Sequence, residues 1–235
     1  MKLLDHFTVY SCIGCGSVLK GRNVLCDECR IKLKAETALR CPDCKAPHHA
    51  CACAPEGGLF AHAIHLAPYL EYGVARNIVL GCKKIKNKAL FDLVADFMAH
   101  EMVNRLPIEE QTLLIGVPRS AHSKRNYGFD QTEQVLTRIA ARLQLNDVPA
   151  LRHKGRKMQK SLSMAERVEN ANDAFSLLPK YQDFIAGRPV ILYDDLVASG
   201  ATVCACARLL KAAGAQQIEL ASFARRPKAI QKSSK

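Results

Sequence analysis

Hydrophobic residues follow a regular pattern along most of the chain, and this pattern begins near residues 55–58. Downstream of that point, short apolar runs predict strands at 58–69, 113–118, 190–193 and 218–224. Apolar residues recur at helical spacing over 73–105, 131–145 and 202–213, and the basic run 83–88 divides the first of these into two helices. Strands that alternate with helices predict an α/β fold in which helices flank a parallel sheet.

The residues before this point carry cysteine pairs and short turns in place of long apolar stretches. The chain of 235 residues, 49% of them hydrophobic, is long enough for one α/β domain with a packed core and a small accessory module. We therefore predict a small cysteine-rich module over 1–57, an α/β domain over 58–227 and a basic tail over 228–235.

The formal net charge of +12 favours anionic partners, either nucleic acid or phosphorylated small molecules, although a basic surface can also serve solubility alone. Tryptophan is absent and aromatic residues make up 6%, which argues against a broad surface for stacking bases. No run of about 18 apolar residues occurs, and Asp5 and His6 interrupt the first apolar stretch. We expect a cytoplasmic protein without membrane insertion.

Eight of the eleven cysteines lie in the N-terminal module, and the first set forms two CxxC pairs: Cys12, Cys15, Cys26 and Cys29. Two such pairs suit one tetrahedral Zn²⁺, because each tight turn presents two thiolates to the ion. Four sulfur ligands leave no open coordination position, so the predicted site is structural. In a cytoplasmic protein this spacing favours metal over disulfides.

The second set is less regular, because its last pair is one residue short of a CxxC: Cys41, Cys44, Cys51 and Cys53. We predict a second zinc site on these four thiolates, with His48 or His49 in place of one cysteine as the alternative. A module this short has no core of its own, so metal binding would supply its folding energy. The isolated Cys82, Cys204 and Cys206 are expected to be small buried hydrophobic residues.

The stretch 189–202, PVILYDDLVASGAT, carries the clearest chemistry. An apolar strand ends in Asp194 and Asp195, and a short loop with Gly200 then enters a helix. Ligands of parallel sheets bind at this end of the strands, and the free N–H groups of a helix N-terminus favour a phosphate. Carboxylates suit a sugar diol beside that phosphate, alone or with Mg²⁺. A diol and a phosphate together describe a ribose 5-phosphate.

These residues resemble the type I phosphoribosyltransferase signature of two acidic residues before a Thr-Thr-Gly-x-Thr-like loop, with Ala198 and Ser199 at the first two threonine positions. Residues 117–131 resemble the ComF run Val-Pro, basic residues, Arg-Gly-Phe-Asn-Gln, with Tyr127 and Asp130 as its two departures. Residues 151–175 resemble the ComF segment that includes Gln-x-x-Leu-Ser. Because a cysteine module also precedes the transferase-like part, the chain is identified as a member of the ComF family.

The resemblance implies the following ligand residues. Phosphoribosyl pyrophosphate (PRPP), with Mg²⁺, would be bound by Ala198, Ser199, Gly200, Ala201, Thr202, Arg119 and Ser120. Asp194 and Asp195 would be the catalytic carboxylates, and residues 151–175 would form the loop that closes over PRPP. Single-stranded DNA would contact Lys83, Lys84 and Lys86.

The resemblance also implies a role in natural transformation, in which the protein handles incoming single-stranded DNA and works with DNA-uptake or recombination proteins. One alternative is a metabolic phosphoribosyltransferase that joins an unidentified base to ribose 5-phosphate. Another is a zinc-dependent interaction protein whose ligand site has decayed, which Ala198 permits, although the intact Asp194, Asp195 and Gly200 argue against complete decay. Whether the chain catalyses phosphoribosyl transfer or only binds PRPP stays open at this point.

Overall fold

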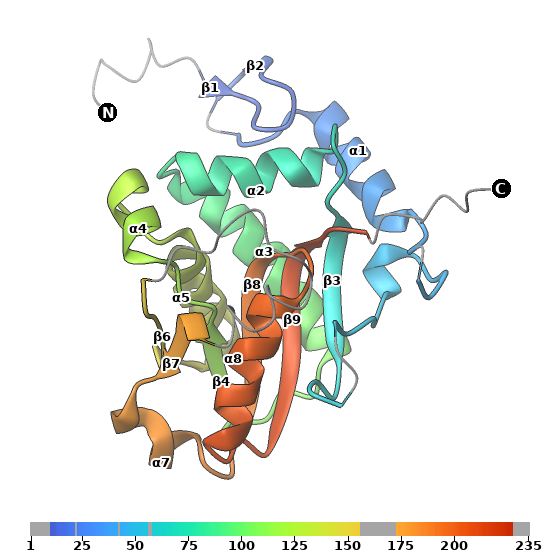
Figure 1. Ribbon diagram of the computed structural model, residues 1–235. Coiled ribbons are helices and arrows are strands. Elements are labelled where there is room, and N and C mark those ends of the chain that lie inside the picture. Colours follow the sequence, from blue (N-terminus) through green and yellow to red (C-terminus); the bar gives the residue numbers. More distant parts are fainter. Residues whose placement is uncertain (1–9, 22, 42, 56–57, 156–172, 228–235) are drawn as a thin grey trace, which may run out of the picture.

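The computed structural model describes residues 10–21, 23–41, 43–55, 58–155 and 173–227. Its centre is a parallel sheet of five strands (Figure 1). The order across the sheet is β3 (Ala63–Pro68), β9 (Gln217–Arg225), β8 (Pro189–Val197), β4 (Leu113–Gly116) and β5 (Asn146–Asp147). The predicted α/β fold with a parallel sheet is confirmed.

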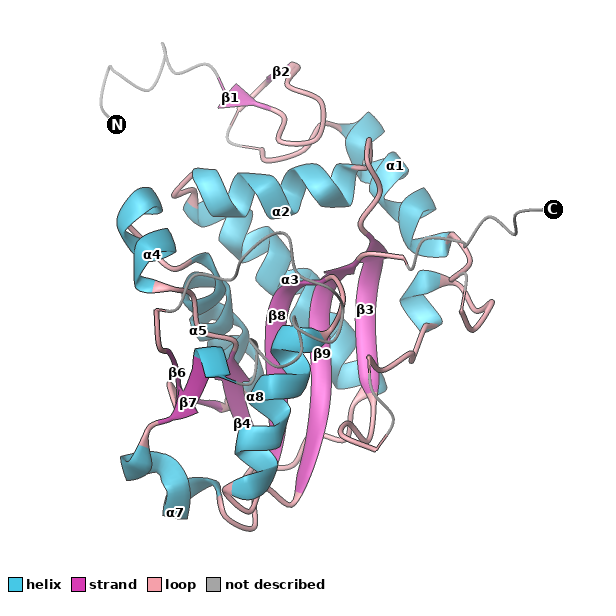
Figure 2. Cartoon of the chain, in the orientation of Figure 1, coloured by secondary structure: helices cyan, strands magenta, loops and turns pink. Residues whose placement is uncertain are grey.

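Helices cover both faces of the sheet, and the shorter elements lie around it (Figures 1 and 2). The helices are α1 (Asp27–Ala38), α2 (Val74–Lys84), α3 (Lys88–Arg105), α4 (Ala121–Tyr127), α5 (Gln131–Leu143), α7 (Gln182–Ile185) and α8 (Ala201–Ala212). Short 3-10 turns, η2 (His48–Ala50) and η3 (Pro179–Tyr181), and two small antiparallel pairs, β1 (Tyr10–Ser11) with β2 (Val18–Leu19) and β6 (Leu151–His153) with β7 (Phe175–Leu177), complete the fold.

Strand β8 shows why its apolar run needs helices on both sides. Ile191 and Tyr193 belong to the core formed with α2, α3 and α5, whereas Val190 and Leu192 belong to the core formed with α8. Successive residues of a strand point to opposite faces, so a strand that is buried on both faces is apolar throughout. The strand continues through the two aspartates to Val197, four residues beyond the expected end at residue 193.

The basic run 83–88 separates two helices, as predicted. Helix α2 ends at Lys84, and Asn87 begins α3 by accepting a hydrogen bond from the Leu90 N–H at 3.2 Å through its side chain. Asparagine is a favoured N-cap because its oxygen satisfies one of the free N–H groups of the first turn. Helices α1 and α4 lack the apolar periodicity that would predict them: α1 buries only Cys29 and Leu33, and α4 buries no residue.

The cysteine-rich residues pack against the α/β part. Leu25 and Leu33 belong to the same core as α2. The Glu36 carboxylate accepts the N–H groups of Val74 and Ala75 at 2.6 and 3.0 Å and so caps α2, whose own N-cap residue, a glycine, offers no side chain. The division into folding units near residue 57 stays a prediction, and the described residues on its two sides share one core.

Candidate functional site

The loop between β8 and α8 has the geometry of an anion site. Gly200 is the N-cap of α8 with φ +85°, a backbone conformation that glycine adopts at low cost. No side chain caps this helix from the N-cap position, and the Ser199 hydroxyl accepts only the Ala201 N–H, at 3.4 Å. A hollow of about 70 Å³ lies inside the loop, lined by Asp194, Ser199 and Thr202 among others. The N-terminal N–H groups of α8 can therefore receive a phosphate.

The two aspartates at the end of β8 have different surroundings. Asp194 lines the hollow beside the loop. Asp195 is 7% exposed and accepts hydrogen bonds from Arg119 Nη2 at 2.6 Å and Gln131 Nε2 at 3.0 Å, and Lys83 Nζ lies 3.5 Å from the same oxygen. Neighbouring residues of a strand point to opposite faces, so one strand places the two carboxylates in separate environments.

The Asp194 carboxyl has a raised pKa. Burial, together with the negative charge of Asp195, raises the pKa of Asp194 to about 8, although Arg119 and Lys83 oppose the shift. Two cations, Arg119 and Lys83, contact the Asp195 carboxylate. Asp194 is thus a carboxyl that can hold a proton near neutral pH, and it lines the hollow of the loop.

Arg119 and Ser120 lie in the segment that connects β4 to α4. Arg119 contacts Asp195, as above, and its role in binding PRPP remains a prediction. Ser120 is the N-cap of α4: its hydroxyl accepts the Ser123 N–H at 3.2 Å and lies 3.0 Å from the Ser123 hydroxyl. Binding of a phosphate by Ser120 remains a prediction, and its hydroxyl already caps α4.

The three predicted DNA-binding lysines lie at the end of α2 and in the turn after it, with unequal exposure. Lys84 and Lys86 are exposed, whereas Lys83 is half-buried and paired with Asp195. Lys83 therefore belongs to the candidate phosphate site, together with Arg119. Its sequence neighbours remain available to a larger anionic partner.

The first cysteine set converges on one point. Cys12, Cys15, Cys26 and Cys29 place their sulfurs within 4.8 Å of one another, and the Sγ atoms of Cys15 and Cys26 are 3.8 Å apart. A tetrahedron with Zn–S bonds of about 2.3 Å has edges of about 3.8 Å, so the residues fit Zn²⁺. The Cys26 N–H points at Cys12 Sγ at 3.3 Å and the Cys29 N–H at Cys26 Sγ at 3.4 Å, which further favours thiolates.

The second cysteine centre consists of Cys41, Cys44, Cys51 and Cys53, whose sulfurs also lie within 4.8 Å of one another. The Sγ distances of 3.7 Å for Cys44–Cys51 and 4.0 Å for Cys41–Cys53 again match the edge of a zinc–sulfur tetrahedron. His49 instead places Nδ1 2.9 Å from the Thr37 carbonyl oxygen, and His48 is buried outside the group. Among the described residues the centre is therefore built from the four cysteines, and both clusters could bind zinc.

Several residues that shape the site carry weak signals in the sequence. Gln131, at the start of α5, contacts Asp195, and Pro55 packs against Gly200. Of these, only Gln131 lies in a segment of family resemblance. The predicted closing loop over 151–175 falls mostly on residues 156–172, which lie outside the described residues. Cys82, Cys204 and Cys206 are buried, as predicted.

Comparisons with known proteins agree with this class of fold. Residues 86–235 match the family model of the phosphoribosyl transferase domain, and the chain belongs to that family. Over 94% of its length the chain is also 24% identical to Competence protein F of Haemophilus influenzae, of which the match covers 99%. That relative and the two cysteine clusters confirm the resemblance to ComF proteins.

Among solved structures, the chain is similar to one titled the allosteric regulatory enzyme of purine biosynthesis, with a TM-score of 0.41 and 14% identity. The match covers 61% of this chain and 30% of that one. Within the part of the chain that the structure describes, no helix is both long and apolar enough to cross a membrane.

Proposed function

We propose that this protein is a competence factor that binds PRPP with Mg²⁺ at the β8–α8 loop and single-stranded DNA on the adjacent basic surface, in the cytoplasm, during natural transformation. The observation that carries the PRPP proposal is the uncapped N-terminus of α8 beside Asp194 and the hollow. The free N–H groups of this helix favour a phosphate. The Asp194 carboxylate can accept hydrogen bonds from the two hydroxyls of a sugar diol beside that phosphate.

Each charged residue of the site has a place in this proposal. The loop from Ala198 to Thr202 holds the 5-phosphate, and Asp194 accepts the ribose hydroxyls directly or through Mg²⁺. The pyrophosphate lies toward Arg119 and Lys83, the two cations that Asp195 now holds at 2.6 and 3.5 Å. When bound, PRPP supplies an anomeric carbon with a pyrophosphate leaving group, and an acceptor could then be joined to it.

The DNA proposal is supported by the net charge of +12 and by the exposed Lys84 and Lys86 near the phosphate site. Phosphates of any sequence attract such cations, so binding should have little sequence preference and strong salt dependence. The match to Competence protein F over nearly the whole chain supports the role in transformation, and DNA-uptake or recombination proteins are then the expected partners.

Calorimetry with PRPP and Mg²⁺ on the full-length protein tests the ligand. Binding by the wild type above pH 8, where Asp194 is ionised, that is weakened by about 2 kcal/mol in Asp194→Ala through loss of charge-assisted hydrogen bonds would support the proposal. Asp183→Ala is the matched control, since Asp183 is exposed on α7 and lies outside the site. Absence of binding by the wild type at millimolar PRPP would leave only the fold in common with phosphoribosyltransferases.

Pyrophosphate release, followed with and without oligonucleotides, separates a binding protein from an enzyme. Release that depends on DNA would make DNA the acceptor or activator. Release that depends on a free base, with a salvage defect in a null mutant and normal transformation, would favour the metabolic transferase.

A further inference from the structure

The second cysteine centre lies at the carboxyl ends of β3 and β9, the same end of the sheet that carries the phosphate loop (Figure 1). His65 of β3 and Ser222 of β9 are both fully buried. The His65 ring joins the two parts: Nε2 lies 2.9 Å from the Cys53 carbonyl oxygen and Nδ1 lies 2.6 Å from Ser222 Oγ. In the tautomer with hydrogen on Nε2, the ring donates to the Cys53 carbonyl oxygen, and Nδ1 accepts the one hydroxyl hydrogen of Ser222, which otherwise points to the Ala224 carbonyl oxygen 3.2 Å away.

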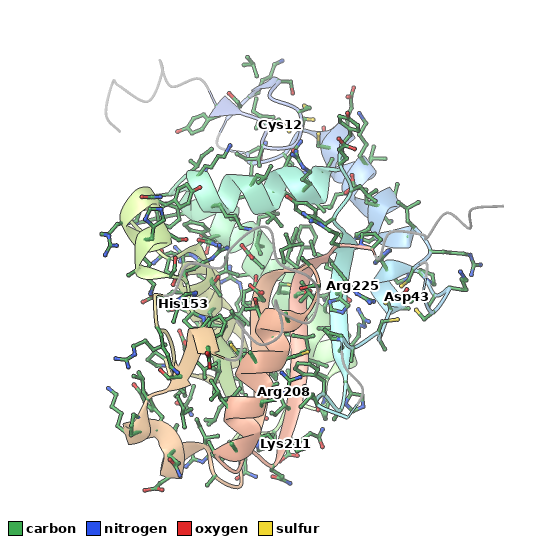
Figure 3. The ribbon with its side chains drawn as sticks, viewed as in Figure 1. Cys12, Asp43, His153, Arg208, Lys211 and Arg225 are labelled. Carbon is green, nitrogen blue, oxygen red and sulfur yellow. The ribbon has the colours of Figure 1, made fainter. Side chains whose placement is uncertain are left out.

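Arg225, the last residue of β9, extends toward the same centre beside Asp43 (Figure 3). It is 5% exposed, and its Nη1 lies 3.9 Å from Cys51 Sγ and 4.0 Å from Cys41 Sγ, while Nη2 donates to Asp43 at 2.8 Å. Four thiolates around Zn²⁺ carry a net charge of −2. A buried guanidinium at this distance offsets part of that charge, and the centre offsets the desolvation of the guanidinium in turn.

The strand register connects these residues to the phosphate loop. Ser222, which His65 contacts, pairs with Asp194 of β8, and Arg225 pairs with Val197, the last residue of β8 before the loop. The Arg226 N–H also donates to the Val197 carbonyl oxygen at 2.8 Å. The residues that hold the centre are therefore the direct neighbours, across the sheet, of the residues that begin the phosphate site.

A second contact comes from the chain that leaves the centre. Pro55, two residues after Cys53, lies against Gly200: a Cβ added to Gly200 would meet Pro55 Cβ closer than atoms can approach and Pro55 Cγ at 2.8 Å. Pro55 is not among the residues that line the hollow of the loop. Pro55 thus contacts the loop at Gly200 without lining the hollow.

We propose that the second cysteine centre is the structural support of the phosphate loop, with Arg225 and His65 as positioning residues and Pro55 as the residue that contacts Gly200. The proposal rests on the proposed function in taking PRPP as the ligand of that loop. Loss of metal from this centre would release Pro55 and the ends of β9 and β8, and the loop would lose the fixed backbone that a phosphate requires.

Hydrogen exchange of the peptide covering 198–203 tests the support without any ligand. Cys44→Ser removes an exposed ligand of the second centre, and Cys15→Ser removes the matching exposed ligand of the first. We expect exchange in this peptide to accelerate several-fold in Cys44→Ser, because the loop then opens locally more often, and less in Cys15→Ser. If exchange of this peptide in Cys44→Ser were no faster than in the wild type or in Cys15→Ser, the proposal would be overturned.

Variants of Arg225 test its positioning role in a chain that keeps the eight cysteines of both centres. Arg225→Gln should speed zinc transfer to a chromophoric chelator from one of the two centres by about tenfold and weaken binding of PRPP with Mg²⁺. Arg225→Lys should restore part of both. Arg226→Gln, the exposed neighbour, should change neither.

The failures are distinguishable. If the wild type does not bind PRPP, the proposed function fails while the exchange and zinc-transfer results still decide the support. If the wild type binds PRPP and Arg225→Gln binds it equally well with accelerated zinc loss, the support proposal fails alone.

Discussion

Replacement of Gly200 by alanine separates two reasons for a glycine in the phosphate loop. The sequence motif attributes Gly200 to close approach of a phosphate, whereas the structure shows a positive φ and contact with Pro55. An L-residue in the left-handed region costs about 1–2 kcal/mol. The collision of the new Cβ with Pro55 should add about 1–3 kcal/mol, the usual cost of overpacking.

Gly187→Ala is the matched control for the backbone cost. Gly187 has φ +73°, and no atom lies within 4 Å of the Cβ that alanine would add. The free energy of unfolding of Gly187→Ala should therefore fall only by the cost of the backbone conformation, about 1–2 kcal/mol. The excess of Gly200→Ala over Gly187→Ala in the free energy of unfolding measures the packing against Pro55.

A double-mutant cycle with Pro55→Gly isolates the contact. Removing the proline ring should relieve the collision, so Gly200→Ala should cost about 1–3 kcal/mol less in the Pro55→Gly background. Urea unfolding followed by circular dichroism, with zinc held constant, supplies the four free energies. A coupling below about 0.5 kcal/mol, the usual limit of additivity for independent sites, would refute the contact between the cysteine-rich segment and the phosphate loop.

Three further results are expected. Elemental analysis should find close to two Zn²⁺ per chain, and a value near one would remove the second cysteine centre. Because the pKa of Asp194 is raised to about 8 in the folded state, the folded protein holds a proton that the unfolded chain releases near pH 4, so this residue's contribution to stability falls as pH rises from about 4 to 8. The unfolding free energy of the wild type relative to Asp194→Asn should drop by about 2 kcal/mol between pH 6 and 8, and a flat difference would contradict the shift. Lys84→Ala with Lys86→Ala should reduce the log–log salt slope of single-stranded DNA binding by about 1.4, with PRPP binding intact, and an unchanged slope would place the DNA elsewhere.

The sequence by itself determined the main elements of the sheet and the chemistry of two kinds of site. Apolar runs of strand length and helical periodicity predicted the strands and helices of the core because burial on both faces of a sheet requires them. Cysteine spacing predicted two sets of four thiolates, which converge as expected. The stretch 189–202 predicted a phosphate loop because local geometry creates it, a strand end followed by a helix start.

Only the tertiary structure decided how these parts meet. The sequence cannot show that Asp194 and Asp195 have separate surroundings, because the partners of Asp195 come from α2, α5 and the segment after β4. The same is true of Arg225 beside Cys41, 184 positions away in the chain. Local pattern specifies elements, whereas contacts between distant residues follow from strand order and register. Those two features place the second cysteine centre beside the phosphate loop.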